Sequence, residues 1–505
     1  MPRLFAIFSM TPKRVVLSIL TGLVALVVAS SLYESFSQPQ VTGQLQLYQS
    51  DLLLQASVWD ELDSDEFKPL GSALLGANPL ESVAKQYKSV RKEAAGGVAR
   101  SQKQLAAQSD SSTPQPEKFQ SAISQQQTLI SDIDLKLGLI AAQQNNVEDA
   151  QQRWQTLSAG DGPTADTANV LLGLWTVPPM ITPTAESTIT SQLNGWFQYR
   201  ALEQLYTLDD RSVDLAQLRE QEQTAAQSKL VKLAAVGTMP VLGCLIGIGI
   251  LIFLSVQWLT QRENSLLGKS AQPWEVPWDA EIIWQVLIVG FFFVGQLLIP
   301  FVLQLSGLSF VATGSRGRAL YSMLFYLLMS ASGIAVLAGS IWAYRPLPKD
   351  WFKLKLLDRW PLWGAGGYVV ALPLMIAISA LNQQIWQGQG GNNPLLQTVL
   401  QESDSVALLL FFLTAAVAAP LFEEVLFRGF LLPSLTRYMP VWGAILISSF
   451  IFASAHLSLS EVLPLTLLGA ILAWVYTRSR NLLSSMLIHS LWNSATLLGL
   501  FLLGS

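Results

Sequence analysis

Three short polar motifs lie in the apolar C-terminal part of this 505-residue chain, and they contain both of its histidines. In order, the motifs are Glu423-Glu424-x-x-x-Arg428, Phe452-x-x-x-His456 and His489-x-x-x-Asn493. Ionisable side chains are costly in a lipid-embedded segment, so their presence there favours a functional interpretation. Carboxylates, imidazoles and an amide on successive helices therefore predict one functional site.

The two glutamates have different expected roles. Glu424 and Arg428 are four residues apart, so they share one helix face and can form an ion pair. Such a pair lets an ionised carboxylate persist in apolar surroundings. Glu423 lies about 100° away around the helix, free of that partner, and can act as a general base on water. A purely structural Glu–Arg pair near the end of a hydrophobic helix is the alternative.

The second and third motifs supply the imidazoles and the amide. His456 shares a helix face with Phe452, and a buried structural histidine is its alternative interpretation. His489 and Asn493 also share a face, and both can donate hydrogen bonds to a developing oxyanion. Asn493 alone would equally suit an interhelical hydrogen bond. His456 lies about 15 residues into its apolar run, roughly 22 Å for a regular helix, so a kink, a tilt or a later helix start must bring it level with the glutamates.

A metal site is an open alternative. One glutamate and two histidines form an adequate three-ligand set for catalytic zinc. However, the chain contains no His-Glu-x-x-His helix, and each imidazole comes from a different apolar segment. The lone Cys244 excludes a cysteine-based zinc site and an intramolecular disulfide. We therefore expect no metal ligand and no cofactor, and a metal-independent reaction.

With all three motifs present in this order, the chain resembles the CPBP family. That family comprises type II CAAX prenyl endopeptidases and bacteriocin-processing or immunity proteins, and it is also called the Abi family. The resemblance covers about residues 362–503. It implies an intramembrane glutamate-dependent peptidase, whereas nothing in the sequence indicates a lipidated substrate.

The resemblance also implies roles for individual residues. Glu423 and His456 match the positions that activate the attacking water. His489 and Asn493 match the pair that holds the oxyanion. The supporting positions are Glu424, Arg428 and Phe452.

Composition predicts the elements that carry these motifs. The chain is 51% hydrophobic and only 13% charged, with a mean hydropathy of +0.38, whereas soluble proteins carry about 25% charged residues. A spanning helix needs roughly 20 apolar residues, which favours an all-α, polytopic membrane helix bundle of about nine spans. The apolar runs are 15–32, 234–259, 282–305, 319–342, 362–381, 406–421, 442–455, 463–476 and 482–503. The first run is predicted to be an uncleaved anchor, with a signal peptide as the alternative.

The region between the first two runs is polar and acidic. Residues 33–233 hold 24 Asp and Glu against 15 Lys and Arg, which does not suit nucleic-acid binding. Apolar spacings predict amphipathic helices there. Gly138, Ala150 and Trp154 have the offsets of one tetratricopeptide repeat, and a generic helical hairpin is the alternative. We expect an extracytoplasmic helical domain that offers a docking surface for a protein partner.

Loop charges predict the topology. Arg3, Lys13 and Arg14 place the N-terminus in the cytoplasm, and the basic loop 344–360 falls on the same side. Arg316 and Arg318 contradict this pattern, because they fall outside. The predicted organisation is an anchor (1–32), the acidic domain (33–233), preceding membrane helices (234–360) and a CPBP-like catalytic membrane domain (361–505).

We therefore predict an integral, multi-pass membrane endopeptidase. It would hydrolyse a peptide bond of a membrane-associated protein or peptide, with the lipid bilayer as its surroundings. The alternative is a non-catalytic membrane scaffold or an immunity-type regulator that acts through its helical ectodomain. A transporter is disfavoured, because no inverted repeat with broken helices is evident.

Overall fold

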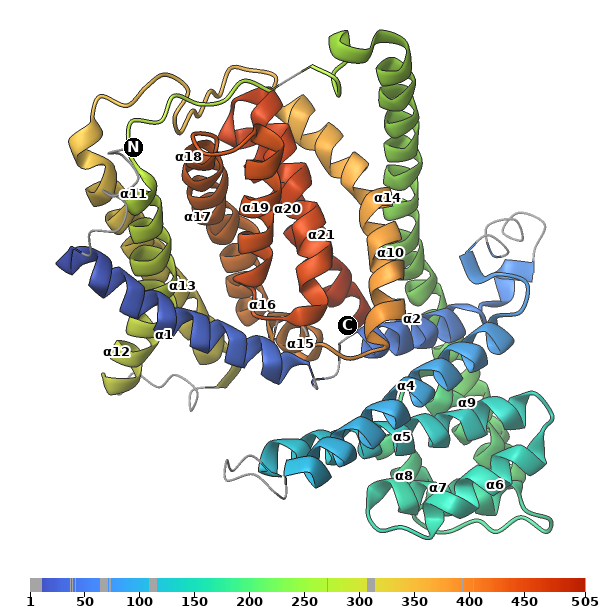
Figure 1. The fold of residues 1–505 in the computed structure, drawn as a ribbon. Coiled ribbons are helices and arrows are strands. Elements are labelled where there is room, and N and C mark those ends of the chain that lie inside the picture. Colours follow the sequence, from blue (N-terminus) through green and yellow to red (C-terminus); the bar gives the residue numbers. More distant parts are fainter. Residues whose placement is uncertain are drawn as a thin grey trace. The chain divides into compact units, whose positions relative to one another are not determined.

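A computed structural model describes the fold, and every regular element in its described part is a helix (Figure 1). The chain forms two compact units, a membrane unit (1–36, 240–386 and 390–505) and a second unit (37–239 and 387–389). The described residues are 11–36, 38, 40, 42–63, 71, 74–108, 116–269, 271–306, 314–391, 394–402 and 404–504. Arg3, used above for the topology, lies outside them.

The described residues contain eight helices long and apolar enough to span a membrane. They coincide with eight of the nine predicted runs, which confirms the polytopic all-α class. The ninth run forms the shorter apolar helix Val441–Ser454. The eight are Pro12–Ser35, Ser212–Asn264, Ala280–Leu305, Gly314–Tyr344, Trp360–Trp386, Ser405–Leu435, Leu459–Ser479 and Leu482–Leu502.

Several of these spans consist of more than one segment. In the membrane unit the elements are α1 (Pro12–Ser35), α11 (Ala280–Gln285), η4 (Val286–Leu298), α12 (Ile299–Leu305), α13 (Gly314–Ile341), η6 (Trp342–Tyr344), α14 (Trp360–Trp386), α15 (Pro394–Gln401), α16 (Ser405–Phe412), η7 (Leu413–Ala418), α17 (Ala419–Glu423), η8 (Glu424–Leu431), α18 (Leu432–Leu435), α19 (Val441–Ser454), α20 (Leu459–Ser479) and α21 (Leu482–Gly504). The long helix α10 (Ser212–Gln261), followed by η3 (Arg262–Asn264), runs from the second unit into this one.

One helix extends further than its apolar run predicts. The run ends at residue 421, but the helix continues to Leu435, so the glutamates lie well inside it rather than near its end. The helix begins at an N-cap, Asp404, whose carboxylate accepts hydrogen bonds from the backbone N–H of Val406 and Ala407. Arg316 also donates to this carboxylate at 2.8 Å. The arginine that departs from the predicted charge pattern is thus paired with an acidic cap.

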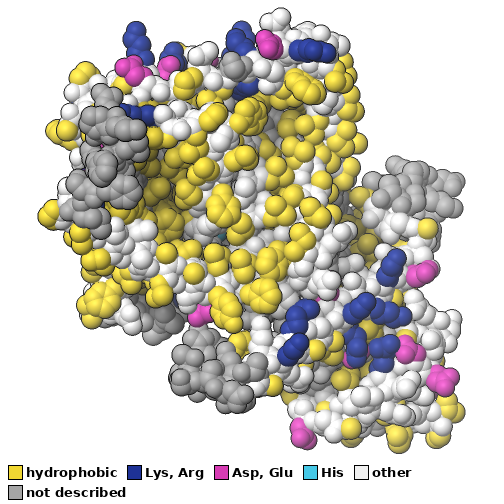
Figure 2. Space-filling model, viewed as in Figure 1, with side chains coloured by type: hydrophobic (Ala, Val, Ile, Leu, Met, Phe, Trp, Pro, Cys, Tyr) yellow, Lys and Arg dark blue, Asp and Glu magenta, His cyan; other side chains and the backbone are white. Residues whose placement is uncertain are grey.

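Small residues let the helices of the membrane unit approach one another closely. A Cβ atom at Gly333 of α13 would lie 2.9 Å from the ring of Phe422 on α17. A Cβ at Gly364 of α14 would lie 2.5 Å from Leu487 on α21. Small residues are enriched at helix contacts in membranes for this reason. Figure 2 shows a broad hydrophobic surface on this unit, with Lys and Arg gathered along one of its edges.

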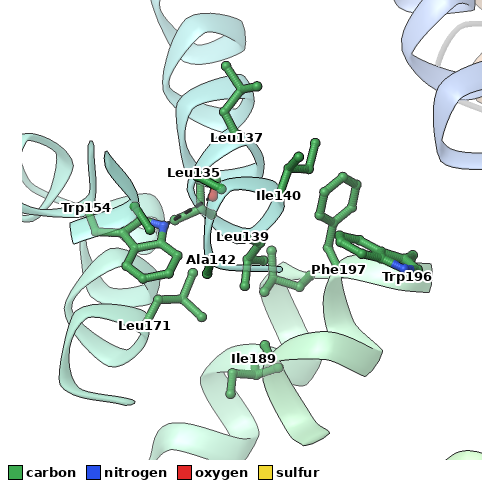
Figure 3. Packing of buried hydrophobic residues seen from close by; sticks show 14 of the residues in the cluster. Leu135, Leu137, Leu139, Ile140, Ala142, Trp154, Leu171, Ile189, Trp196 and Phe197 are labelled. Atoms are coloured by element: carbon green, nitrogen blue, oxygen red, sulfur yellow. Dashed lines mark hydrogen bonds between the residues drawn. The ribbon is translucent and has the colours of Figure 1, made fainter. Parts of the chain in front are cut away.

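The second unit is a helical domain with its own apolar core. Its elements are α2 (Thr42–Ala56), η2 (Asp60–Asp63), α4 (Pro79–Gln108), α5 (Pro116–Gln143), α6 (Val147–Ser158), α7 (Pro163–Trp175), α8 (Ala185–Gln192) and α9 (Gly195–Leu208). Trp154 is fully buried between α5 and α7, and its indole N–H donates to the carbonyl of Leu135 (Figure 3). A Cβ at Gly138 would lie 2.3 Å from that indole nitrogen. The glycine thus permits the α5–α6 hairpin, while the tetratricopeptide assignment stays a prediction.

A carboxyl group lies among the apolar residues of this second unit. The hydroxyl of the buried Tyr87 donates to Asp51, and Lys136 pairs with Asp132 at 3.0 Å. Burial raises the pKa of Asp51 from its ordinary 3.8 to about 6, although Lys136 and the tyrosine bond act in the opposite direction. This domain therefore contains a group that titrates near neutral pH.

Candidate active site

The glutamates lie where a membrane helix departs from α-helical geometry. Glu423 is the last residue of α17, and Glu424 begins the π-helical segment η8. A second π-helical segment, η7, precedes α17. Such segments are rare and occur frequently at functional sites. The irregular geometry presents two adjacent carboxylates to different neighbours.

Glu424 forms a fully buried ion pair. The Nη1 of Arg428 donates to its Oε1 at 2.7 Å, and the two side chains are 0% and 1% exposed. The Nη2 of Arg428 donates to the carbonyl oxygen of Gly469 on α20, at 3.3 Å. The predicted pair is therefore present, and the arginine also binds it to a neighbouring helix.

His489 joins the two carboxylates. Its Nδ1 lies 2.9 Å from Oε1 of Glu424, which can only accept when ionised, so Nδ1 carries the proton in this bond. The opposite nitrogen, Nε2, lies 3.8 Å from Oε2 of Glu423. That separation is too long for a hydrogen bond, and within the described residues Oε2 of Glu423 has no hydrogen-bond partner. Both atoms are free to bind a third molecule, such as water.

A tyrosine from another helix completes the contacts of Glu423. The hydroxyl of Tyr326 on α13 donates to Oε1 of Glu423 at 2.8 Å. Its ring also meets that of Phe422 edge-on, next to the tight contact with Gly333. Sequence reasoning missed Tyr326, because it lies in an apolar run with no motif around it. The available signal was a phenol inside a membrane helix, and the same helix also contains Tyr321.

Phe452 brings the three motifs together. Its ring lies 4.4 Å from the guanidinium carbon of Arg428. The ring centroids of His456 and His489 are 4.9 and 5.8 Å away from its own. Helix α19 ends at Ser454, so His456 follows it in a turn, and its Nδ1 donates to the carbonyl of Phe452 at 2.9 Å. The helix end brings His456 to this cluster.

Asn493 lies at one side of this cluster. Its amide donates to the carbonyl of Ala415 in η7 at 2.7 Å, which is the interhelical bond that the sequence offered as an alternative. A second amide hydrogen remains for another acceptor. Among the described residues, no hydrogen bond or ion pair joins Asn493 or His456 to Glu423. Hydrogen bonds thus join Glu424 to Arg428 and to His489, while Glu423 is bonded to Tyr326 and faces His489 without a direct hydrogen bond.

The site offers a base and donors rather than an evident metal centre. Within the described residues, no group of three or more His, Cys, Asp or Glu side chains is arranged to hold a metal ion. Metal independence itself stays a prediction. These features define a polytopic helical membrane protein with a carboxylate–histidine site inside its C-terminal helices.

Comparison with known families assigns this C-terminal segment. Residues 405–495 match the family described as "Type II CAAX prenyl endopeptidase Rce1-like". The match begins at the first residue of α16 and includes every predicted site residue from Glu423 to Asn493. The C-terminal membrane segment is therefore an Rce1-like domain, which confirms the resemblance that the motifs predicted.

Three curated relatives each match only a part of this chain. "Putative membrane peptidase YdiL" of Bacillus subtilis is 25% identical over 166 residues, which cover 32% of this chain and 67% of that protein. "UPF0177 protein YxdF" of Lactococcus lactis is 39% identical over 75 residues, 15% of this chain and 41% of that protein. An uncharacterized 24.3 kDa protein of Escherichia coli is 35% identical over 112 residues, 21% of this chain and 50% of that protein. No solved structure matches this chain significantly.

Proposed function

We propose that this protein is an intramembrane endopeptidase that hydrolyses a peptide bond of a membrane-associated protein or peptide. The observation that carries the proposal is the unpartnered Oε2 of Glu423, which faces Nε2 of His489 at 3.8 Å. A water molecule about 2.8 Å from each atom would contact both. The Rce1-like assignment and the similarity to a protein named as a membrane peptidase support the same reaction class.

In the proposed reaction, Glu423 takes a proton from water while the water oxygen attacks the scissile carbonyl carbon. The carbonyl oxygen becomes an oxyanion, which hydrogen-bond donors stabilise. The donors in this scheme are the remaining amide hydrogen of Asn493 and an Nε2–H of His489, which the ring must carry in addition to its Nδ1–H. Glu423 then returns the proton to the leaving amine as the C–N bond breaks. His456, beyond the Phe452 ring, assists Glu423 with the water.

The other contacts hold these groups in place. Tyr326 occupies Oε1 of Glu423, which leaves Oε2 as the basic atom. Glu424 holds the ring of His489 through Nδ1, and Arg428 balances the charge of Glu424. Such neighbours orient catalytic groups and limit their motion. Polar groups at this depth need a water-accessible cavity between helices.

The test compares new N-termini in membranes from cells that express the full-length chain or Glu423→Gln. The amide cannot act as a general base, whose contribution is typically 10²–10⁴-fold, so we expect cleavages that disappear in the variant. Glu275→Gln is the matched control, because Glu275 is exposed in a loop. Identical N-termini with Glu423→Gln would refute the peptidase and favour the scaffold alternative.

A further inference from the structure

A loop between two spanning helices lies at one end of the membrane unit. Residues 345–359 connect η6, which ends the span Gly314–Tyr344, to Trp360, which begins the next span. Since both flanking helices cross the membrane, this loop lies at a membrane surface. It runs at the same end of the unit as the turn between α20 and α21 (Figure 1).

Three leucines of this loop are unusually exposed. Leu354, Leu356 and Leu357, here called the leucine triplet, are 55%, 75% and 101% exposed. Tryptophan flanks the loop on both sides, at Trp342 and Trp360. Tryptophan is enriched at membrane–water interfaces, and clustered exposed apolar side chains mark interaction sites. The triplet therefore needs a covering partner at the level of the membrane surface.

The loop backbone is fixed to the helix bundle. The Asn481 amide donates to the carbonyl of Lys355 at 2.8 Å, and the N–H of Leu482 donates to the carbonyl of Lys353 at 3.0 Å. On the inner side, Trp351 is 8% exposed and its indole donates to the carbonyl of Glu275 at 2.9 Å. Because these contacts hold the chain, the triplet faces outward as part of the fold.

The loop also carries an excess of positive charge. Residues 344–360 contain five Lys and Arg but only two Asp. One of these, Asp350, pairs with Lys353 at 2.7 Å, and this hydrogen bond is the main reason that the pKa of Asp350 is lowered. Four cations of the loop are exposed and have no ion pair in the described part of the chain. Arg345 lies over the ring of Trp342, 4.4 Å from its centroid. The other three, Lys349, Lys355 and Arg359, are here called the loop cations.

We propose that residues 345–359 form a binding surface for anionic phospholipids. The leucine triplet enters the boundary between headgroups and acyl chains, and the loop cations bind the lipid phosphates. Interfacial segments combine an apolar face with Lys and Arg in this way, and their binding depends on lipid charge. Charge complementarity selects anionic lipid over zwitterionic lipid, because each cation near an anionic surface strengthens binding about fivefold. The proposal does not depend on the proposed peptidase activity.

The test follows the environment of the triplet in nanodiscs. Full-length protein carrying Cys244→Ser and Leu357→Cys is labelled with an environment-sensitive fluorophore at position 357. Quenching by iodide is compared between phosphatidylcholine discs and discs with equal parts of phosphatidylcholine and phosphatidylglycerol. We expect the anionic lipid to protect the fluorophore. Replacing the three loop cations by Gln should lower the equilibrium ratio of lipid-inserted loop to water-exposed loop on the order of 100-fold.

Two matched variants separate charge from folding. Exchanging Lys and Arg at the loop cations keeps the charge and should keep the protection. Lys85→Gln, Lys88→Gln and Lys92→Gln together remove as many exposed cations from α4, and should change nothing. An unaltered unfolding midpoint shows that each variant is folded.

Four results would overturn the proposal. Equal quenching in both kinds of disc, or protection that survives the Gln replacements, removes the role of lipid charge. Protection in phosphatidylcholine discs by added glycerol phosphate would show a site for free phosphate instead. Full iodide access in both discs would show that the triplet faces water and suits a soluble protein partner.

Discussion

Replacing Arg428 by Met tests the buried ion pair at the centre of the site. The change keeps much of the apolar stem and removes the charge from a side chain that is 1% exposed, opposite a carboxylate that is 0% exposed. Glu424 then loses the charged donor of its ion pair while it keeps the bond to His489, and the carbonyl of Gly469 loses a hydrogen bond. Removing one partner of a buried pair costs about 3–5 kcal/mol, and we expect a loss of stability in that range.

The double variant Glu424→Gln with Arg428→Met should recover much of this loss, because no uncompensated charge remains buried. The stabilities of the four proteins, from denaturant titration in detergent followed by tryptophan fluorescence, form a double-mutant cycle. Arg316→Met is the matched control. Its pair with Asp404 is 67% and 27% exposed, so it should cost less than about 1 kcal/mol. A similarly small cost for Arg428→Met, or simple additivity in the double variant, would refute the reasoning.

Two further predictions follow from single contacts. Tyr326→Phe should lower kcat about 10- to 100-fold, because the variant loses a hydrogen bond to a charged group. KM should stay unchanged. Both constants are measured on a peptide that the membrane assay shows to be cleaved. Tyr368→Phe should have no effect, and a change in KM alone would contradict the positioning role. Asp51 keeps its proton in the folded chain up to a pKa of about 6, against 3.8 ordinarily. The contribution of Asp51 to the free energy of unfolding is therefore fully present below about pH 4, falls as the pH rises to about 6 and does not change further above that pH. Asp51→Asn should remove this slope in calorimetric unfolding midpoints, and a wild-type midpoint that rises over this range would show the opposite sign.

The sequence was sufficient for the helical class and the spans. Long apolar runs mark spanning helices because the membrane core sets their length. Hydropathy gives the ends of a helix less well. The helix carrying Glu423 continues to Leu435 although its apolar run stops at residue 421. Compensation of Glu424 by Arg428 removes the need for the helix to end where the ionisable residues begin.

The site was predictable where its residues recur at helical spacing. The pairing of Glu424 with Arg428 follows from their separation of four residues. The bond between His489 and Glu424 joins distant segments, and no spacing rule gives it. Tyr326 was hidden for a similar reason, since only the packing of α13 against α17 brings its hydroxyl to Glu423. The depth of His456 depended on where α19 ends, a boundary that apolar runs locate poorly.

The phenol contact of Glu423 has a consequence for where this domain begins. The family match starts at residue 405, whereas Tyr326 belongs to a helix outside the matched range. A shortened chain cut at the family border would keep both glutamates and both histidines, yet Oε1 of Glu423 would lose its donor. The segment that matches the family and the set of residues that contact Glu423 therefore begin at different positions in the chain. A truncated chain that is meant to keep the site intact should therefore retain α13.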